Sequence, residues 1–230
     1  MRGLFVTGTD TGVGKTVLAA ALCAALVARG ERVAAFKPAV TGLDEKPGDW
    51  PPDHELLASV IGRAPSEVSP NLFGPAASPH LAAELAGGEL NPAELVSAAR
   101  AAADRADVLV VEGVGGLLVP LAPGYSVRDL CSELGLPLLV AARPGLGTIN
   151  HTLLTVEAAR TAGLEVAAVV LTPWPAQPSR VEQSNRVTIE QATELPVHEL
   201  PTTTREGLAE AGTRLPLSQW LDSTRQTPTP

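Results

Sequence analysis

Short, continuous apolar runs alternate along this chain with longer stretches in which apolar residues recur at helical spacing. Continuous runs predict buried strands, and the longer periodic stretches predict helices. On this pattern, strands are predicted at 3–7, 32–37, 107–112, 117–120, 138–142, 166–171 and 197–200. Helices are predicted at 17–29, 53–61, 79–87, 92–105, 126–134, 145–163 and 180–194.

The alternation of strands with helices predicts a single α/β domain built as a doubly wound, mostly parallel sheet. We expect this domain to span 1–222, because no repeat or linker divides it. The tail at 223–230 ends Thr-Pro-Thr-Pro and is predicted to be disordered. The segments expected to form loops, turns or irregular structure are 38–52, 64–79, 113–116 and 172–179.

A glycine-rich segment between the first strand and the first helix has the composition of a phosphate-binding loop. It reads Gly-Thr-Asp-Thr-Gly-Val-Gly-Lys-Thr at 8–16. Glycines let backbone N–H groups approach phosphate oxygens, Lys15 would reach the outer phosphates, and the Thr16 hydroxyl would ligate magnesium. Five residues separate Gly8 from Gly14 where the general pattern has four, so this is a variant P-loop of the NTPase type. An ordinary strand-to-helix turn would not require Lys-Thr after Gly14.

Composition and charge narrow the class of protein. The 230 residues are 45% hydrophobic and 3% aromatic, enough for one large core of alanine, valine and leucine. The net charge of −8 argues against a protein that coats nucleic acid or binds membranes through basic residues. The apolar run at 17–28 is shorter than a membrane span, and nothing before Leu4 resembles a signal peptide. Cys23 and Cys131 are expected to be buried thiols, so we expect a cytoplasmic protein.

Polar residues follow other predicted strands at the edge where parallel sheets bind ligands. Lys37 ends the second strand, Glu112 ends the third, and Thr172 follows a later one. Glu112 is predicted to hold magnesium directly or through water, with a capping or salt-bridging role as the alternative. Asp53 begins a predicted helix after two prolines, so capping of that helix is an equally weighted interpretation.

Lysine is scarce, which draws attention to Lys37. Only three of the 17 basic residues are lysines: Lys15 in the phosphate loop, Lys37, and Lys46 in a charged loop where it is expected to be solvated. A lysine that closes a buried strand needs a partner for its charge. We therefore predict a functional role for Lys37.

Four segments in a fixed order carry a family resemblance. They are 8–16, Lys-Pro-Ala-Val-Thr-Gly at 37–42, Val-Glu-Gly-Val-Gly-Gly-Leu-Leu-Val-Pro at 111–120 and Gly-Thr-Ile-Asn-His-Thr at 147–152. A fainter fifth is Ser-Pro-His at 78–80. Together they resemble the dethiobiotin synthetase family over roughly the first 200 residues, and the five-residue gap of the phosphate loop is normal for that family.

The resemblance implies an ATP- and magnesium-dependent ligase of biotin biosynthesis. In that family, 7,8-diaminononanoate and carbon dioxide are closed into the cyclic urea of dethiobiotin. The diamine forms a carbamate, the carbamate oxygen attacks the γ-phosphate, and the second amine displaces phosphate, leaving ADP. Two anions must meet in this reaction, so cations have to offset their repulsion in the transition state.

The resemblance also assigns roles to residues. It implies that Thr16, Asp53 and Glu112 ligate magnesium and that Lys37 and Lys15 are catalytic. Thr41 corresponds to a hydroxyl that contacts the diamine or its carbamate. The nucleotide contacts that it implies are Gly12, Val13, Gly14, Lys15, Thr16, Val17, Asp53, Glu112, Gly113, Val114, Gly115, Thr172, Pro201, Thr202 and Thr203.

The segment at 147–152 implies a homodimer. In the family the helix that it opens comes from the partner subunit, and its free N–H groups receive the substrate carboxylate. Gly147, Thr148 and Asn150 are therefore expected to bind substrate across the subunit interface. Capping of the helix by Thr148 and Asn150 is the alternative interpretation.

The sequence departs from the family near the nucleotide base. Many relatives have an asparagine after the strand at 166–171, where it contacts adenine, and this chain has Thr172. Threonine lacks the paired donor and acceptor of an amide. We therefore hypothesise relaxed base selectivity, with nucleoside triphosphates other than ATP accepted.

Two other functions compete with this interpretation. A nucleotide-switch ATPase of the partitioning and site-selection type usually has an extra lysine early in the phosphate loop, where this chain has Thr9, Asp10 and Thr11. An amide-forming ligase acting on a large corrinoid acid would need a glutamine-hydrolysing domain, for which this chain is too short. ADP release that depends on the diamine would distinguish the three.

Overall fold

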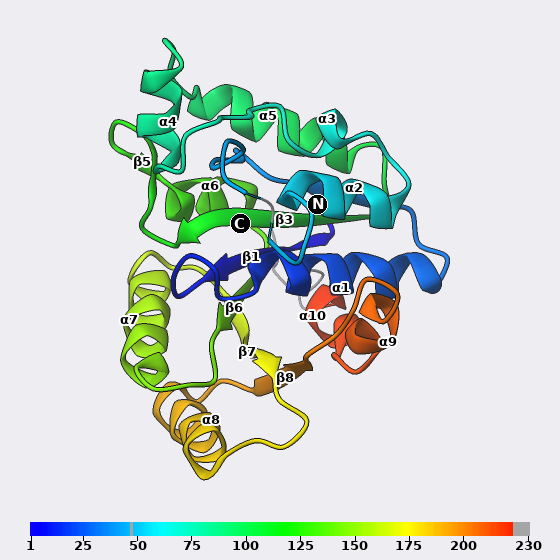
Figure 1. Cartoon of the computed structure of the whole chain (residues 1–230), viewed down its shortest axis with the longest axis vertical. Helices are drawn as coiled ribbons and strands as arrows, with labels where there is room; N and C mark the ends of the chain where they lie inside the picture. Colours follow the sequence, from blue (N-terminus) through cyan, green and yellow to red (C-terminus); the bar gives the residue numbers. More distant parts are fainter. Residues whose placement is uncertain (47, 223–230) are drawn as a thin grey trace, which may run out of the picture.

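The computed structural model describes residues 1–46 and 48–222, and it confirms the predicted single α/β domain (Figure 1). The parallel strands of the main sheet are ordered β2-β3-β1-β6-β7-β8. These strands are β1 Gly3–Gly8, β2 Val33–Phe36, β3 Val108–Gly116, β6 Leu138–Ala142, β7 Val166–Trp174 and β8 Val197–Pro201. The helices are α1 Lys15–Ala28, α2 Asp53–Ile61, α3 Pro65–Val68, α4 Pro79–Leu85, α5 Pro92–Ala103, α6 Val127–Leu134, α7 Thr148–Thr161, α8 Arg180–Thr193, α9 Leu208–Thr213 and α10 Leu217–Asp222. The tail at 223–230 lies outside the described residues.

Helices cover both faces of the sheet, and alternation along β1 divides the core between them. Leu4 and Val6 pack in one cluster with side chains of α1, α2, α9 and α10. Phe5 packs in the other cluster, with α5, α6 and α7. All three side chains are fully buried, and burial of each stabilises the fold by about 1.5–3 kcal/mol.

The strand order places the phosphate loop where the winding of the sheet reverses. After β1 the chain forms β2 and β3 on one side of it, and then β6, β7 and β8 on the other. Ligands of doubly wound sheets bind at this point, beyond the carboxyl ends of the strands. The loop that follows β1 therefore lies at the expected position, in the middle of the ligand edge (Figure 1).

Several predicted boundaries were wrong at this edge. The turn expected at 113–116 continues β3, because Gly116 pairs with Gly8 of β1 after an irregularity in the register. The loop expected from residue 172 begins later, because β7 extends to Trp174 opposite Pro201 of β8. In both cases a neighbouring strand continues the pairing beyond the apolar run.

Other differences concern short elements. The strand expected at 117–120 is replaced by an antiparallel hairpin of β4 Pro120–Ala122 and β5 Tyr125–Ser126. The segment at 64–79 contains the one-turn helix α3, and α9 and α10 were not predicted. Helix α1 begins at Lys15, two residues earlier than expected, because Gly14 in a left-handed conformation starts the helix directly from the loop.

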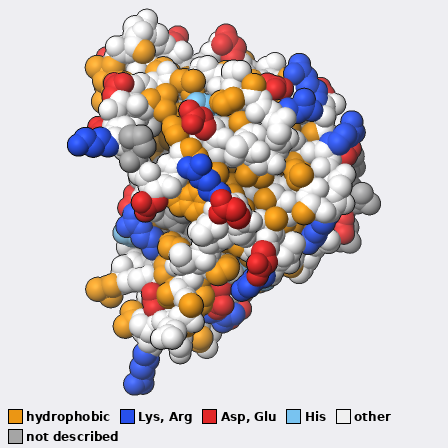
Figure 2. Space-filling view, turned by 45° about the vertical axis from the view of Figure 1, so that its right-hand side comes forward, with side chains coloured by type: hydrophobic (Ala, Val, Ile, Leu, Met, Phe, Trp, Pro, Cys, Tyr) orange, Lys and Arg blue, Asp and Glu red, His pale blue; other side chains and the backbone are white. Residues whose placement is uncertain are grey.

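The cysteines and the lengths of the helices agree with what the sequence predicts. Cys23 and Cys131 are buried free thiols, as predicted. Within 1–46 and 48–222, no helix is long and apolar enough to cross a membrane. On the face turned forward in Figure 2, acidic and basic side chains are interspersed among apolar ones.

Candidate active site

The phosphate loop is shaped by two glycines with positive φ. Gly12 has φ 70° and Gly14 has φ 94°, a region that other residues rarely adopt. Lys15 folds back across the loop, and its Nζ donates a hydrogen bond to the backbone oxygen of Asp10 at 2.9 Å. The loop thus directs an ammonium group and the start of α1 toward one space, the arrangement that binds phosphate.

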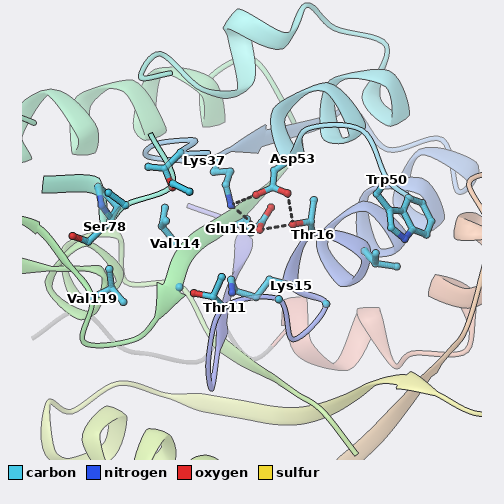
Figure 3. Close-up of a pocket in the computed structure, with 18 residues that line it drawn as sticks. Thr11, Lys15, Thr16, Lys37, Trp50, Asp53, Ser78, Glu112, Val114 and Val119 are labelled. Carbon is cyan, nitrogen blue, oxygen red and sulfur yellow. Dashed lines mark hydrogen bonds and ion pairs between the residues drawn. The ribbon is translucent and has the colours of Figure 1, made fainter. Parts of the chain in front are cut away.

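Lys37 lies opposite the loop and joins the two carboxylates predicted to hold magnesium. Its Nζ is 2.7 Å from Oε1 of Glu112 and 2.9 Å from Oδ2 of Asp53 (Figure 3). The same ammonium donates to the backbone oxygen of Gly113 at 3.3 Å. The Thr16 hydroxyl lies 2.8 Å from Oδ1 of Asp53 and 2.8 Å from Oε1 of Glu112. Residues from four separate parts of the sequence therefore meet at one point.

The alternative interpretation of Asp53 as a helix cap is wrong. Pro52 occupies the cap position of α2, with no side-chain cap hydrogen bond. The Asp53 carboxylate instead accepts a hydrogen bond from the Thr16 hydroxyl and forms an ion pair with Lys37. Glu112 does form a salt bridge, the alternative interpretation of this residue, because its carboxylate pairs with Lys37.

Burial and charge determine the protonation of this cluster. Burial opposes the charge of Lys37, but Asp53 and Glu112 outweigh it and raise the pKa of the ammonium. Burial also opposes ionisation of Asp53, yet Lys37 holds the pKa of that carboxyl below its ordinary value. For Glu112 burial prevails and raises the pKa. Burial and then the charge of Lys37 lower the pKa of Lys15 to about 8. The site therefore holds a fixed positive charge at Lys37.

The oxygens of this cluster fit a hard divalent cation. Thr16 has one hydroxyl proton but lies within hydrogen-bond distance of two carboxylates. Oε2 of Glu112 is buried and has no hydrogen-bond partner. Magnesium is commonly held by one or two carboxylates, with phosphates and water completing its octahedron. Two carboxylates and a hydroxyl satisfy that requirement; the described residues contain no larger cluster of His, Cys, Asp and Glu.

A cavity of about 650 Å³ contains the cluster and the loop (Figure 3). Of the predicted site residues it is lined by Gly12, Gly14, Lys15, Thr16, Val17, Lys37, Thr41, Asp53, Glu112, Val114 and Gly115. It is also lined by residues that sequence reasoning missed or only touched: Thr11, Trp50, Ala76, Ala77, Ser78, Pro79 and Val119. The faint motif at 78–80 could have predicted that Ser78 and Pro79 line the cavity. For Trp50 the sequence offered no signal except its position shortly before Asp53.

The residues predicted to contact the base lie together but outside this cavity. Thr172 is 1% exposed, and a Cβ on Gly14 would lie 3.0 Å from its side chain. Thr172 therefore packs beneath the phosphate loop. The backbone N–H of Thr202 donates to the oxygen of Trp174 at 3.0 Å, which holds the segment 201–203 beside the end of β7. Val13 and Gly113 are buried behind the cavity wall.

The residues predicted to bind the substrate carboxylate, Gly147, Thr148 and Asn150, do not line the cavity that contains the phosphate loop and Lys37. Gly147, not Thr148 or Asn150, occupies the cap position of α7, and no side chain caps this helix. The capping interpretation of those two residues is therefore wrong. A second cavity, of about 410 Å³, lies between this helix and the loop and is lined by Thr9, Asp10, Gly116, Leu117, Leu118, Val119, Pro120, Leu154, Thr155 and Ala158.

Comparison with known proteins identifies the family. A family model described as an AAA domain matches residues 2–201. A protein of Anaeromyxobacter dehalogenans named ATP-dependent dethiobiotin synthetase is 53% identical over 74% of this chain and 76% of its own length. Another with this name, from Haloferax mediterranei, is 38% identical over 97% of this chain and 95% of its own length. The chain belongs to the dethiobiotin synthetase family. The resemblance carried by the four segments is thus confirmed, as is the prediction of an enzyme of the ligase class.

Solved structures with a similar fold include P-loop ATPases of other function. A ParA family ATPase from Chlorobium tepidum has a TM-score of 0.57 at 13% identity, covering 98% of this chain and 94% of that one. The cell division ATPase MinD from Pyrococcus furiosus has a TM-score of 0.52 at 16% identity, covering 98% and 99%. At such identities the likeness concerns the fold alone, and it agrees with the predicted P-loop NTPase architecture of this dethiobiotin synthetase family member.

Proposed function

We propose that this protein forms the ureido ring of dethiobiotin from 7,8-diaminononanoate and carbon dioxide, using ATP and magnesium in biotin biosynthesis. The observation that supports it best is the convergence of Lys37, Asp53, Glu112 and the phosphate loop in one cavity. A carbamate and a triphosphate are both anionic, and this cavity brings together the cations that such a reaction requires. Family membership supplies the choice of substrates.

Each residue of the site has a role in the proposed reaction that follows from its position. Lys15 and the loop N–H groups hold the outer phosphates, and Val114 and Gly115 form the wall beside them, with Gly113 buried behind it. Thr16, Asp53 and Glu112 would hold a magnesium ion, which would offset negative charge on the phosphates. Lys37 stabilises the charge that develops as the carbamate oxygen attacks the γ-phosphate, and Thr41 orients the diamine or its carbamate. The second amine then attacks the carbamic–phosphoric anhydride and releases phosphate, with ring closure favoured because both amines belong to one molecule.

The fixed charge of Lys37 also acts on the diamine. A nearby cation disfavours protonation of an amine, and only the unprotonated amine is nucleophilic. Lys37 therefore serves both anion stabilisation and amine activation from one position.

The active protein in this proposal is a homodimer in the cytoplasm, with no nucleic acid or membrane partner. Leu146 is 97% exposed beside the start of α7, and Leu118 and Leu154 near the second cavity are 57% and 56% exposed. Exposed apolar residues gathered near one site are typical of subunit interfaces. A second copy covering this face would bring its own Gly147, Thr148 and Asn150 to the substrate carboxylate.

Nucleotide recognition in this proposal is base-tolerant. Thr172 is buried against Gly14, and it offers no amide to a base edge. Pro201, Thr202 and Thr203 form the remaining contact surface near the base. ATP is the expected co-substrate, and other nucleoside triphosphates are accepted.

The deciding experiment measures ADP release by the wild-type protein with bicarbonate, in the presence and absence of diaminononanoate. We expect release to depend on the diamine and to yield dethiobiotin, detected by mass spectrometry. The K46M variant, which alters an exposed lysine in the loop before α2, serves as the control and should retain activity. Hydrolysis of ATP at the same rate without diamine would instead identify a nucleotide switch and refute the proposal.

A further inference from the structure

The ammonium group of Lys37 lies between the two carboxylates that are predicted to hold magnesium. Its Nζ is 2.7 Å from Oε1 of Glu112 and 2.9 Å from Oδ2 of Asp53, and the side chain of Lys37 is 3% exposed. Both carboxylates are also in contact with Thr16, the third oxygen donor of the cluster. The carboxylates that would bind a metal ion are therefore already paired with an ammonium group of the protein itself.

The charges of the site balance without any ion. Lys15 and Lys37 carry two positive charges, and Asp53 and Glu112 carry two negative charges when ionised. A divalent cation added alone would face two ammonium groups in a largely buried space, which is electrostatically unfavourable. A nucleoside triphosphate adds several negative charges at the phosphate loop and reverses that balance.

We propose that Lys37 is an internal counter-ion that keeps divalent cations out of the Asp53–Glu112 pair until a nucleotide is bound. This inference rests on the proposed function only in that it requires nucleotide phosphates at the loop. When those phosphates are present, they attract the ammonium and release the carboxylates to the metal. Metal loading and the movement of Lys37 toward the reacting phosphate are then one coupled event.

The backbone offers a path for this movement. Lys37 Nζ already donates to the oxygen of Gly113, one residue beyond Glu112 on β3. Val114 and Gly115, the next residues on that strand, line the same cavity, as does Thr41. In Figure 3, Val114 lies on the side of the cluster away from Thr16. The ammonium can therefore leave Asp53 while it retains a hydrogen-bond acceptor on β3.

The test is binding of Mn²⁺, measured by electron paramagnetic resonance with no nucleotide and no diamine. We expect the wild type to bind weakly and K37M to bind at least about tenfold more tightly, since the carboxylates lose their counter-ion. K37R keeps the charge and should bind as weakly as the wild type. K46M is the matched control for loss of a lysine elsewhere. In K37M/E112Q the gain should disappear, which would assign it to this cluster.

Addition of a non-hydrolysable ATP analogue gives a second readout. It should tighten Mn²⁺ binding more in the wild type than in K37M, because only the wild type must displace an ammonium. Circular dichroism verifies folding, and K37Q replaces K37M if the latter is unfolded. Equal Mn²⁺ affinity in wild type and the folded neutral variant, or a gain in K37R as large as in K37M, would overturn the inference. Failure of the proposed synthesis would show separately, as turnover independent of the diamine, because Mn²⁺ binding is measured without it.

Discussion

Two regions on either side of the phosphate loop differ in how complete they are within one chain. On one side, Lys37, Asp53, Glu112 and Thr16 form a mutually paired cluster in which Lys37 and Glu112 are buried and the other two are half-buried. On the other side, the middle of α7 at 154–158 and the strip at 116–120 border an open cavity with exposed leucines. In the function that we propose, the first region needs only a nucleotide and a metal ion to be complete, whereas the second needs a second copy of the chain to cover it.

In the function that we propose, the difference follows from what each region would bind. Phosphate and metal require charges placed to within fractions of an ångström, and a packed sheet edge supplies that rigidity. An extended aliphatic diamine with a carboxylate needs a long apolar enclosure, which two copies can form between them. We infer that the chemical half of the site belongs to one chain and that the half that selects substrate is shared.

Replacement of Lys37 should have the largest effect on the paired region. We expect K37M to lower kcat by about 10²–10³, because it removes a cation that stabilises the transition state. Steady-state ADP release measures this, with K46M as the control. If K37M retained the wild-type kcat, the role of the cluster would be structural. The catalytic groups would then have to lie outside the Lys37 cluster.

Disruption of the open region should have an intermediate effect of a different kind. Burial of a leucine contributes about 1.5–3 kcal/mol, so L146E should raise the dimer dissociation constant at least about tenfold. Specific activity should then fall on dilution, while the affinity for nucleotide stays unchanged. Analytical ultracentrifugation and activity at several protein concentrations measure this. V27E, which alters a partly exposed residue at the far end of α1, is the matched control. A monomeric wild type with full activity would contradict the shared site.

Base selectivity should show the smallest effect. We expect the kcat/KM values of the wild type for ATP, CTP and GTP to lie within about tenfold of each other, because no side-chain amide at position 172 selects a base edge. T172V removes the hydroxyl at nearly constant size and should leave these ratios unchanged, since Thr172 packs beneath Gly14. A strong preference of the wild type for ATP would refute relaxed selectivity.

The sequence by itself determined the order of elements, the doubly wound fold and the phosphate loop. Apolar runs define strands locally, and the spacing of Gly14, Lys15 and Thr16 carries its chemistry within one turn of chain. It also identified Lys37 and Glu112 as groups at the ligand edge. These features depend on residues close together in the chain, so a local pattern suffices to predict them.

Only the tertiary structure excluded helix capping, one of the two roles considered for Asp53, and showed where β3 and β7 end. Asp53 begins a helix in either role, and its contact with Thr16 bridges 37 positions of sequence. The last residues of β3 and β7 are held by Gly8 and Pro201, partners on other strands. The position of the Lys37 ammonium between two carboxylates likewise depends on three elements meeting. Pairing and charge neutralisation act across space, and the local pattern of a chain does not record them.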